Sequence, residues 1–128
     1  MKVRNKPTRI LLVDDEPNIL LAIEFLLKKE GYTIKKAFNG QQALDTVVSF
    51  RPDIIVLDVM MPEFDGFEVA RRIRNMPSFE DVRIIFLTAK GTETDKMKGY
   101  TSGGEVYLIK PFDNDELVQV INEVVVYG

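Results

Sequence analysis

Five residues that could carry out chemistry together directly follow short apolar runs of this sequence. They are Asp14 and Asp15 after the first run, then Asp58, Thr88 and Lys110 after three later runs. Apolar runs of this length are typical of buried parallel strands. The carboxyl ends of such strands form one edge of a sheet, where ligands bind. We therefore expect the five side chains to line a single site.

The residue types in this set suit a metal ion and a phosphoryl group. Three carboxylates in one pocket repel one another and require a cation. The chain has no histidine and no cysteine, so a hard divalent ion is indicated, and Mg²⁺ is favoured because it uses few carboxylates and accepts phosphate oxygens. An aspartate can attack phosphorus to give an aspartyl phosphate. The Lys110 ammonium would offset phosphoryl charge, and the Thr88 hydroxyl can donate a hydrogen bond to it.

Each of these residues also has an ordinary structural explanation. Asp14 or Asp15 could cap the helix that follows, and Asp58 could belong to a turn. Thr88 could be a plain strand residue, and Lys110 a solvated surface charge. Taken one at a time, the structural explanation is the more common one. Together, however, these explanations do not account for four strand ends that carry groups suited to one site.

The segments that must position these residues alternate between strand and helix patterns. A more polar segment, Thr33–Ala37, suits an edge strand because lysine is tolerated there. The alternation predicts an α/β fold with a doubly wound, five-stranded parallel sheet flanked by five helices. We predict a single domain over residues 1–128, with residues 1–8 as a flexible N-terminal extension. The four apolar runs are Ile10–Val13, Ile54–Leu57, Ile84–Leu87 and Val106–Ile109.

Helices are predicted from apolar stripes, with Pro17 in a first turn and Gly31 at a C-terminal cap. Asp113 and Asn114 are candidate N-caps of the last helix. The segment 91–103 is predicted to be a weakly anchored helix that can move, because it carries few bulky apolar residues. The stripes are Ile19, Ala22, Ile23, Leu26 and Leu27; Ala43, Leu44, Val47 and Val48; Val69, Ala70 and Ile73; and Leu117, Val118, Val120, Ile121, Val124 and Val125.

Composition excludes several classes of protein. The formal net charge of −3 and the absence of a long basic tract argue against nucleic acid as the ligand. The apolar runs are too short to span a bilayer, and the N-terminus lacks a signal-peptide pattern. With no cysteine, disulfides and thiolate sites are excluded. We expect a cytoplasmic protein that does not bind membranes.

Four stretches around the candidate residues form a specific set of motifs. They are Ile10–Glu16, Asp58–Pro62 with Asp65–Phe67, Leu87–Ala89 and Tyr107–Phe112. With these motifs the chain resembles the chemotaxis-Y-like receiver domain of bacterial two-component response regulators, from about Arg9 onward. The resemblance implies the strand order 2-1-3-4-5. It also implies a phosphoacceptor in signal transduction rather than a turnover enzyme.

The resemblance further implies a role for each acid. Asp58 would be the phosphorylation site, and it would bind Mg²⁺ directly together with Asp15. Asp14 would act mainly through a bound water, and the backbone carbonyl of Met60 would be a further ligand. The phosphoryl donor would be a histidine kinase or a phosphotransfer protein.

The resemblance also implies a conformational switch that responds to phosphorylation. Thr88 and Lys110 would contact that group, and Tyr107 would turn inward when Thr88 shifts, although a plain core aromatic is the alternative for Tyr107. The Lys110–Pro111 peptide bond would be cis. The output surface would comprise the segment 91–103, the fifth strand and the last helix, and its target would be an unidentified protein.

Some positions depart from the family pattern. Gly104 replaces the usual alanine, and Val106 stands where an acid is common. The last helix, 116–125, has no Lys or Arg, so charge-paired dimers of the winged-helix regulators are not expected. A monomer or a phosphorylation-dependent dimer is expected. Neither Met60 nor Lys90 can orient an attacking water, so we expect slow self-dephosphorylation.

The sequence leaves three alternatives to a stand-alone receiver. The chain could be a receiver within a longer regulator that has a DNA-binding or catalytic output domain, although a stand-alone receiver is our first expectation. An aspartate-nucleophile phosphatase would want an acid where Met60 stands. A nucleotide- or flavin-binding enzyme would want a glycine-rich loop after Val13, but the loop there is acidic.

Overall fold

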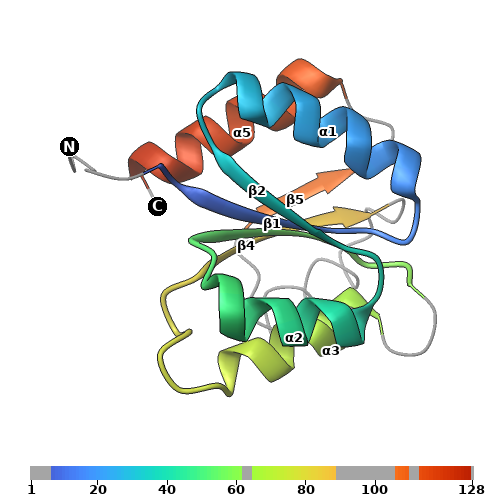
Figure 1. Cartoon of the computed structure of the whole chain (residues 1–128), viewed down its shortest axis with the longest axis vertical. Coiled ribbons are helices and arrows are strands. Elements are labelled where there is room, and N and C mark those ends of the chain that lie inside the picture. The colour runs from blue at the N-terminus through green and yellow to red at the C-terminus, as the bar shows by residue number, and fades with distance from the viewer. Residues whose placement is uncertain (1–6, 62–64, 89–105, 110–112, 128) are drawn as a thin grey trace.

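Five parallel strands form the centre of the computed structural model (Figure 1). The structure describes residues 7–61, 65–88, 106–109 and 113–127. The strand order is β2-β1-β3-β4-β5, as predicted, with β2 at one edge. The strands are β1 (Arg9–Val13), β2 (Thr33–Ala37), β3 (Ile54–Asp58), β4 (Arg83–Thr88) and β5 (Val106–Ile109).

Helices cover both faces of the sheet, so the predicted doubly wound α/β fold is confirmed (Figure 1). One face carries α1 (Pro17–Lys29) and α5 (Asn114–Tyr127), and the other carries α2 (Gly40–Phe50) and α3 (Gly66–Arg74). A further helix was predicted over 91–103, before β5. This segment lies outside the described residues. Among the described residues, no helix combines the length and the hydropathy that a membrane span requires.

Alternate residues of each strand pack into two separate cores. Leu11 and Val13 of β1 contact the core under α2 and α3, whereas Ile10 and Leu12 contact the core under α1 and α5. All four side chains are fully buried. Burial on both faces explains why these strands are continuous apolar runs rather than alternating ones.

The buried side of α1 differs from the predicted stripe. Leu20, Ile23 and Leu27 are its buried residues, whereas Ala22 is exposed. At 3.6 residues per turn, Ala22 lies about 200° around the helix from Leu20, which is the opposite side. Because α1 is apolar on most sides, spacing alone did not identify the side that is buried.

The ends of α1 follow the predictions. Pro17 opens the helix, and Gly31 follows its C-terminal cap with a positive φ of 92°. The Gly31 N–H donates to the Lys28 carbonyl at 3.0 Å, and the Tyr32 N–H donates to the Leu27 carbonyl at 3.3 Å. This pair of bonds is a Schellman motif, in which glycine is favoured because it adopts a positive φ without steric cost.

Thr8 is the first buried residue in the part of the chain that the structure describes. Thr8 is buried, and its carbonyl accepts the Thr33 N–H at 3.0 Å, one position before the paired part of β1. Residues 1–6 of the predicted N-terminal extension lie outside the described residues. The single domain over 1–128 stays a prediction.

Candidate functional site

The register of β1 and β3 places two acids side by side. Val13 pairs with Leu57 in the parallel ladder, and each is followed directly by an aspartate. Neighbouring strands are about 4.8 Å apart. Asp14 and Asp58 therefore leave adjacent strands at the same level of the sheet.

The next two strands end at the same edge. Asp58 pairs with Leu87 of β4, so Thr88 lies one position beyond it. Thr88 in turn pairs with Ile109, the last residue of β5. Lys110 follows Ile109 directly and lies outside the described residues, as does the predicted cis bond to Pro111. The backbone thus brings the ends of β1, β3, β4 and β5 to one edge of the sheet.

Asp14 does not cap the following helix. It is fully buried, and its Oδ1 accepts the backbone N–H of Glu16 at 3.0 Å. The N-cap position of α1 is Glu16, whose side chain makes no capping bond. The N-cap position of α1 is therefore neither Asp14 nor Asp15.

Three carboxylates gather after β1. One carboxylate oxygen from each of Asp14, Asp15 and Glu16 lies within 4.8 Å of the other two. Among the described residues, these acids alone form such a group of three. Asp15 and Glu16 are exposed. Glu16 was not among the predicted ligands, although its position beside two aspartates was a visible signal. An all-oxygen set of this kind fits a hard divalent cation.

Asp58 is also withdrawn from solvent. The residue is 3% exposed, and its Oδ1 accepts the backbone N–H of Met60 at 3.3 Å. The Val59 N–H donates to the Leu87 carbonyl at 2.9 Å, which continues the sheet by one residue. Two buried aspartates on adjacent strands are costly unless a cation or hydrogen bonds compensate the charge.

Tyr107 packs with two phenylalanines beside this edge. Its ring centroid lies 5.4 Å from that of Phe86 and 6.4 Å from that of Phe67, and the two phenylalanine centroids are 5.1 Å apart. Tyr107 is half-buried. This packing fits both a core aromatic and the predicted switch residue, so its role as a switch stays a prediction.

Comparison with known proteins decides the family. The model of the response regulator receiver domain matches residues 10–122. The chain belongs to this receiver-domain family. The transcriptional regulatory protein TrcR of Mycobacterium tuberculosis is 40% identical over 112 residues, which cover 88% of this chain and 43% of TrcR. This receiver chain therefore spans less than half the length of that relative.

Solved structures agree with the receiver fold. A response regulator from Chloroflexus aurantiacus is 33% identical with a TM-score of 0.87, and the match covers 94% of this chain and 99% of that one. The chemotaxis protein CheY4 of Vibrio cholerae is 30% identical with a TM-score of 0.88, over 92% of this receiver and 98% of CheY4. Both likenesses extend over almost the whole of the compared chains.

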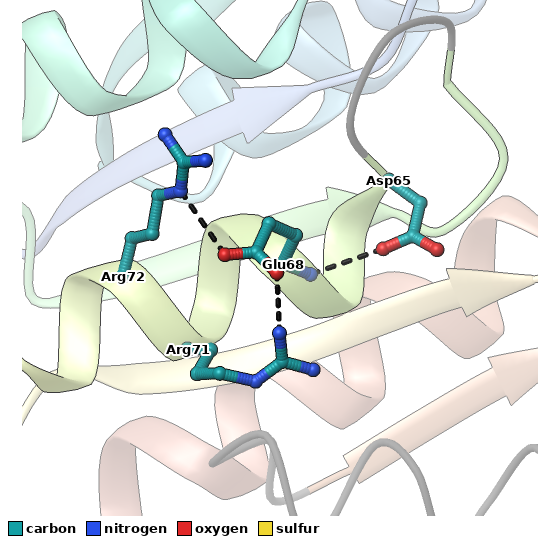
Figure 2. Close-up of polar contacts among 4 residues, drawn as sticks. All are labelled: Asp65, Glu68, Arg71 and Arg72. Atoms are coloured by element: carbon teal, nitrogen blue, oxygen red, sulfur yellow. Dashed lines mark hydrogen bonds and ion pairs between the residues drawn. The ribbon is translucent and has the colours of Figure 1, made fainter.

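The start of α3 is held firmly beside the end of β3. Asp65 occupies the N-cap and its Oδ1 accepts the Glu68 N–H at 3.0 Å (Figure 2). The Glu68 carboxylate turns away from the cap and pairs with Arg71 and with Arg72, where Nε and Oε2 are 3.1 Å apart. The Gly66 N–H donates to the Val59 carbonyl at 3.0 Å. Cap and ion pairs stabilise the turn that touches the end of β3.

Proposed function

We propose that this receiver domain accepts a phosphoryl group on Asp58. The observation that carries the proposal is the pairing of β1 with β3, which sets the buried Asp58 beside the buried Asp14 at the carboxyl edge of the sheet. Membership of the receiver family supports the same assignment. The donor is a histidine kinase or a phosphotransfer protein, and the compartment is the cytoplasm.

In the proposed step, an Asp58 carboxylate oxygen attacks the phosphorus of a phosphohistidine. The O–P bond forms as the P–N bond breaks, and the departing imidazole keeps the electron pair at its ring nitrogen. The Met60 N–H, which already lies 3.3 Å from Asp58 Oδ1, limits the rotation of the carboxylate. Thr88 donates a hydrogen bond to the transferred group, and Lys110 offsets its charge.

Asp14, Asp15 and Asp58 would hold Mg²⁺, with the Met60 carbonyl as a further ligand. The close approach of carboxylate oxygens after β1 supports Asp14 and Asp15 as ligands, and the pairing of β1 with β3 supports Asp58. Oxygen ligands suit Mg²⁺, and the chain has no histidine or cysteine. When bound, the ion supplies positive charge that stabilises the transferring phosphoryl group.

The receiver acts as a switch rather than as a turnover enzyme. Phosphorylation adds negative charge and acceptor oxygens at the strand ends. Thr88 and Tyr107 respond to it, and the protein shifts between inactive and active states that differ at the predicted output surface. Of that surface, β5 and α5 are described, and the segment 91–103 lies outside the described residues. The target of the receiver is a protein, bound by a monomer or by a phosphorylation-dependent dimer.

A receiver within a longer regulator is the second candidate. The observation that favours it is that the match with TrcR, a transcriptional regulatory protein, covers only 43% of that relative. A match of 27% identity to DrrB of Thermotoga maritima, an OmpR/PhoB homolog, likewise covers 52% of that chain. In this case the output domain would be a DNA-binding one, and the length of the open reading frame distinguishes the two candidates.

Incubation with acetyl phosphate and Mg²⁺, followed by intact-mass measurement, tests the proposal. The wild type gains one phosphoryl group, and the Asp58→Asn variant gains none. Asp45→Asn is the matched control, because Asp45 is an exposed aspartate of α2, and it is phosphorylated like the wild type. Removing Mg²⁺ with a chelator prevents the gain. Equal phosphorylation of the wild type and Asp58→Asn would place the acceptor elsewhere.

A further inference from the structure

Gly66 is the residue through which α3 touches the end of β3. It is buried, and a Cβ added to it would overlap the backbone carbonyl oxygen of Asp58. The same atom would lie 3.0 Å from the Val59 Cα and 3.1 Å from the Asp58 carbonyl carbon. These are backbone atoms, which cannot rotate out of the way as the end of a long side chain can.

The contact is the reason that glycine is needed at this position. Gly31 is the described glycine with a positive φ, so the backbone conformation of Gly66 does not itself call for glycine. Glycine is also a poor helix former compared with alanine. The close approach to Asp58 therefore accounts for a residue that is otherwise unfavourable in the first turn of α3.

The far side of the Asp58 peptide is fixed as well. Asp58 pairs with Leu87 of β4, and the Val59 N–H donates to the Leu87 carbonyl at 2.9 Å. The end of β3 is thus held between β4 on one side and the first turn of α3 on the other. A side chain at position 66 would have to push α3 outward or tilt the Asp58 peptide.

We propose that Gly66 is a positioning residue for Asp58. Its missing Cβ lets α3 rest directly on the Asp58 carbonyl, and this contact sets the direction in which the Asp58 carboxylate leaves the strand. The Met60 N–H bond to Asp58 Oδ1 closes a ring that contains the same Asp58–Val59 peptide. The expected effect on phosphorylation rests on the proposed role of Asp58, whereas the expected change in the direction of its carboxylate does not.

Gly66→Ala tests the idea through the rate of phosphorylation by acetyl phosphate in Mg²⁺. We expect a rate constant about tenfold or more below that of the wild type, because small displacements of a reacting group cost this much or more. Circular dichroism establishes that the variant is folded at the assay temperature. An unchanged rate in folded Gly66→Ala would overturn the proposal.

Gly31→Ala is the matched control for lost stability. Its φ of 92° is strained for alanine, yet no heavy atom beyond its two chain neighbours lies within 4 Å of the added Cβ. Gly31 precedes β2, whose first residue pairs with Arg9 at the opposite end of the sheet from Asp58. This variant loses thermal stability and keeps the wild-type rate. If it is slowed as much as Gly66→Ala at equal thermal stability, the effect is general destabilisation and the proposal fails.

The backbone amide of Met60 gives a readout that does not depend on phosphorylation. In ¹⁵N-resolved spectra, its resonance shifts in Gly66→Ala and stays in place in Gly31→Ala. If the wild type takes no phosphate, the proposed function fails, and the Met60 resonance alone decides the positioning role.

If Gly66→Ala does not fold, Asp65→Ala loosens the same turn by removing its cap, and we expect it to be phosphorylated several-fold more slowly. A wild-type rate in Asp65→Ala would overturn the proposal.

Discussion

Met60 donates its backbone N–H to Asp58 Oδ1, and the residue is 53% exposed. The residue two positions after the proposed acceptor is therefore hydrogen-bonded to Asp58 and is itself accessible to solvent. A water that hydrolyses an aspartyl phosphate must approach from solvent. A thioether cannot act as a base and is only a weak acceptor, so Met60 does not orient that water.

We predict that Met60→Asn shortens the lifetime of phosphorylated Asp58 several-fold. The amide would hydrogen-bond an attacking water in line with the phosphorus. Loss of the phosphoryl group, followed by intact mass after removal of the donor, measures the rate. Met60→Leu is the control, since it keeps an apolar side chain of similar size and leaves the lifetime unchanged. A lifetime in Met60→Asn that equals or exceeds that of the wild type would contradict the prediction.

Asp15→Asn should weaken Mg²⁺ binding by about tenfold or more, because even loss of an outer-shell partner of a metal ligand has effects of this size. The Asp15 oxygens lie in the group of three acids after β1, and the side chain is exposed, so the substitution disturbs no core contact. Titration calorimetry with MgCl₂ measures the affinity. Asp81→Asn, an exposed aspartate before β4, keeps the wild-type affinity. Equal affinities in both variants would remove Asp15 from the ligand set.

The sheet was predictable because its strands are simple in sequence. Strands buried on both faces must be apolar at every position. The apolar runs Ile10–Val13 and Ile54–Leu57 could therefore be recognised as strands from the sequence. The polar strand Thr33–Ala37 was correctly placed at an edge. Strand order followed only from the family resemblance, because no local pattern states which strands are neighbours. To predict that Asp14 lies beside Asp58, both the positions of the strands and their order in the sheet were needed.

Helix faces and close contacts were less predictable. Val48 was assigned to the buried stripe of α2 but is 59% exposed, while Ala43 and Val47 are fully buried. Val47 and Val48 are adjacent apolar residues, and periodicity cannot rank them when the stripe is wide. The approach of Gly66 to Asp58 depends on where α3 lies against β3. Such a tertiary contact leaves no sign in the sequence except the glycine itself.

Phe67→Ala should lower the free energy of unfolding by about 3–5 kcal/mol, the usual cost of removing a buried ring. Phe67 is 7% exposed, and its ring contacts those of Phe86 and Tyr107. Urea unfolding followed by circular dichroism measures the change. Phe25→Ala is the matched control, because Phe25 is 61% exposed on α1, and its change should stay near 0.5 kcal/mol, roughly the limit for most surface substitutions. Similar losses in both variants would mean that the aromatic cluster does not stabilise the fold.

Glu24 links α1 to the edge strand and gives stability a pH dependence. Its carboxylate lies 2.9 Å from the Lys36 Nζ and 3.1 Å from the Lys28 Nζ. The hydrogen bond from Lys36 lowers the pKa of Glu24 from its ordinary value of 4.5; burial opposes the shift, and Lys28 adds to the lowering. A group whose pKa is lower in the folded state stabilises the fold fully above its unfolded pKa. That contribution is lost as the pH falls through the folded pKa.

We therefore predict that Glu24→Gln lowers the free energy of unfolding at about pH 7 by up to roughly 1 kcal/mol, the scale of partly exposed ion pairs. The difference from the wild type should shrink as the pH falls below the ordinary pKa of 4.5, because protonated Glu24 no longer attracts Lys36. Urea unfolding over this pH range measures it. Glu80→Gln, an exposed glutamate, should show no such difference. A destabilisation by Glu24→Gln that is the same at neutral and acidic pH would mean that Glu24 acts through packing rather than through its charge.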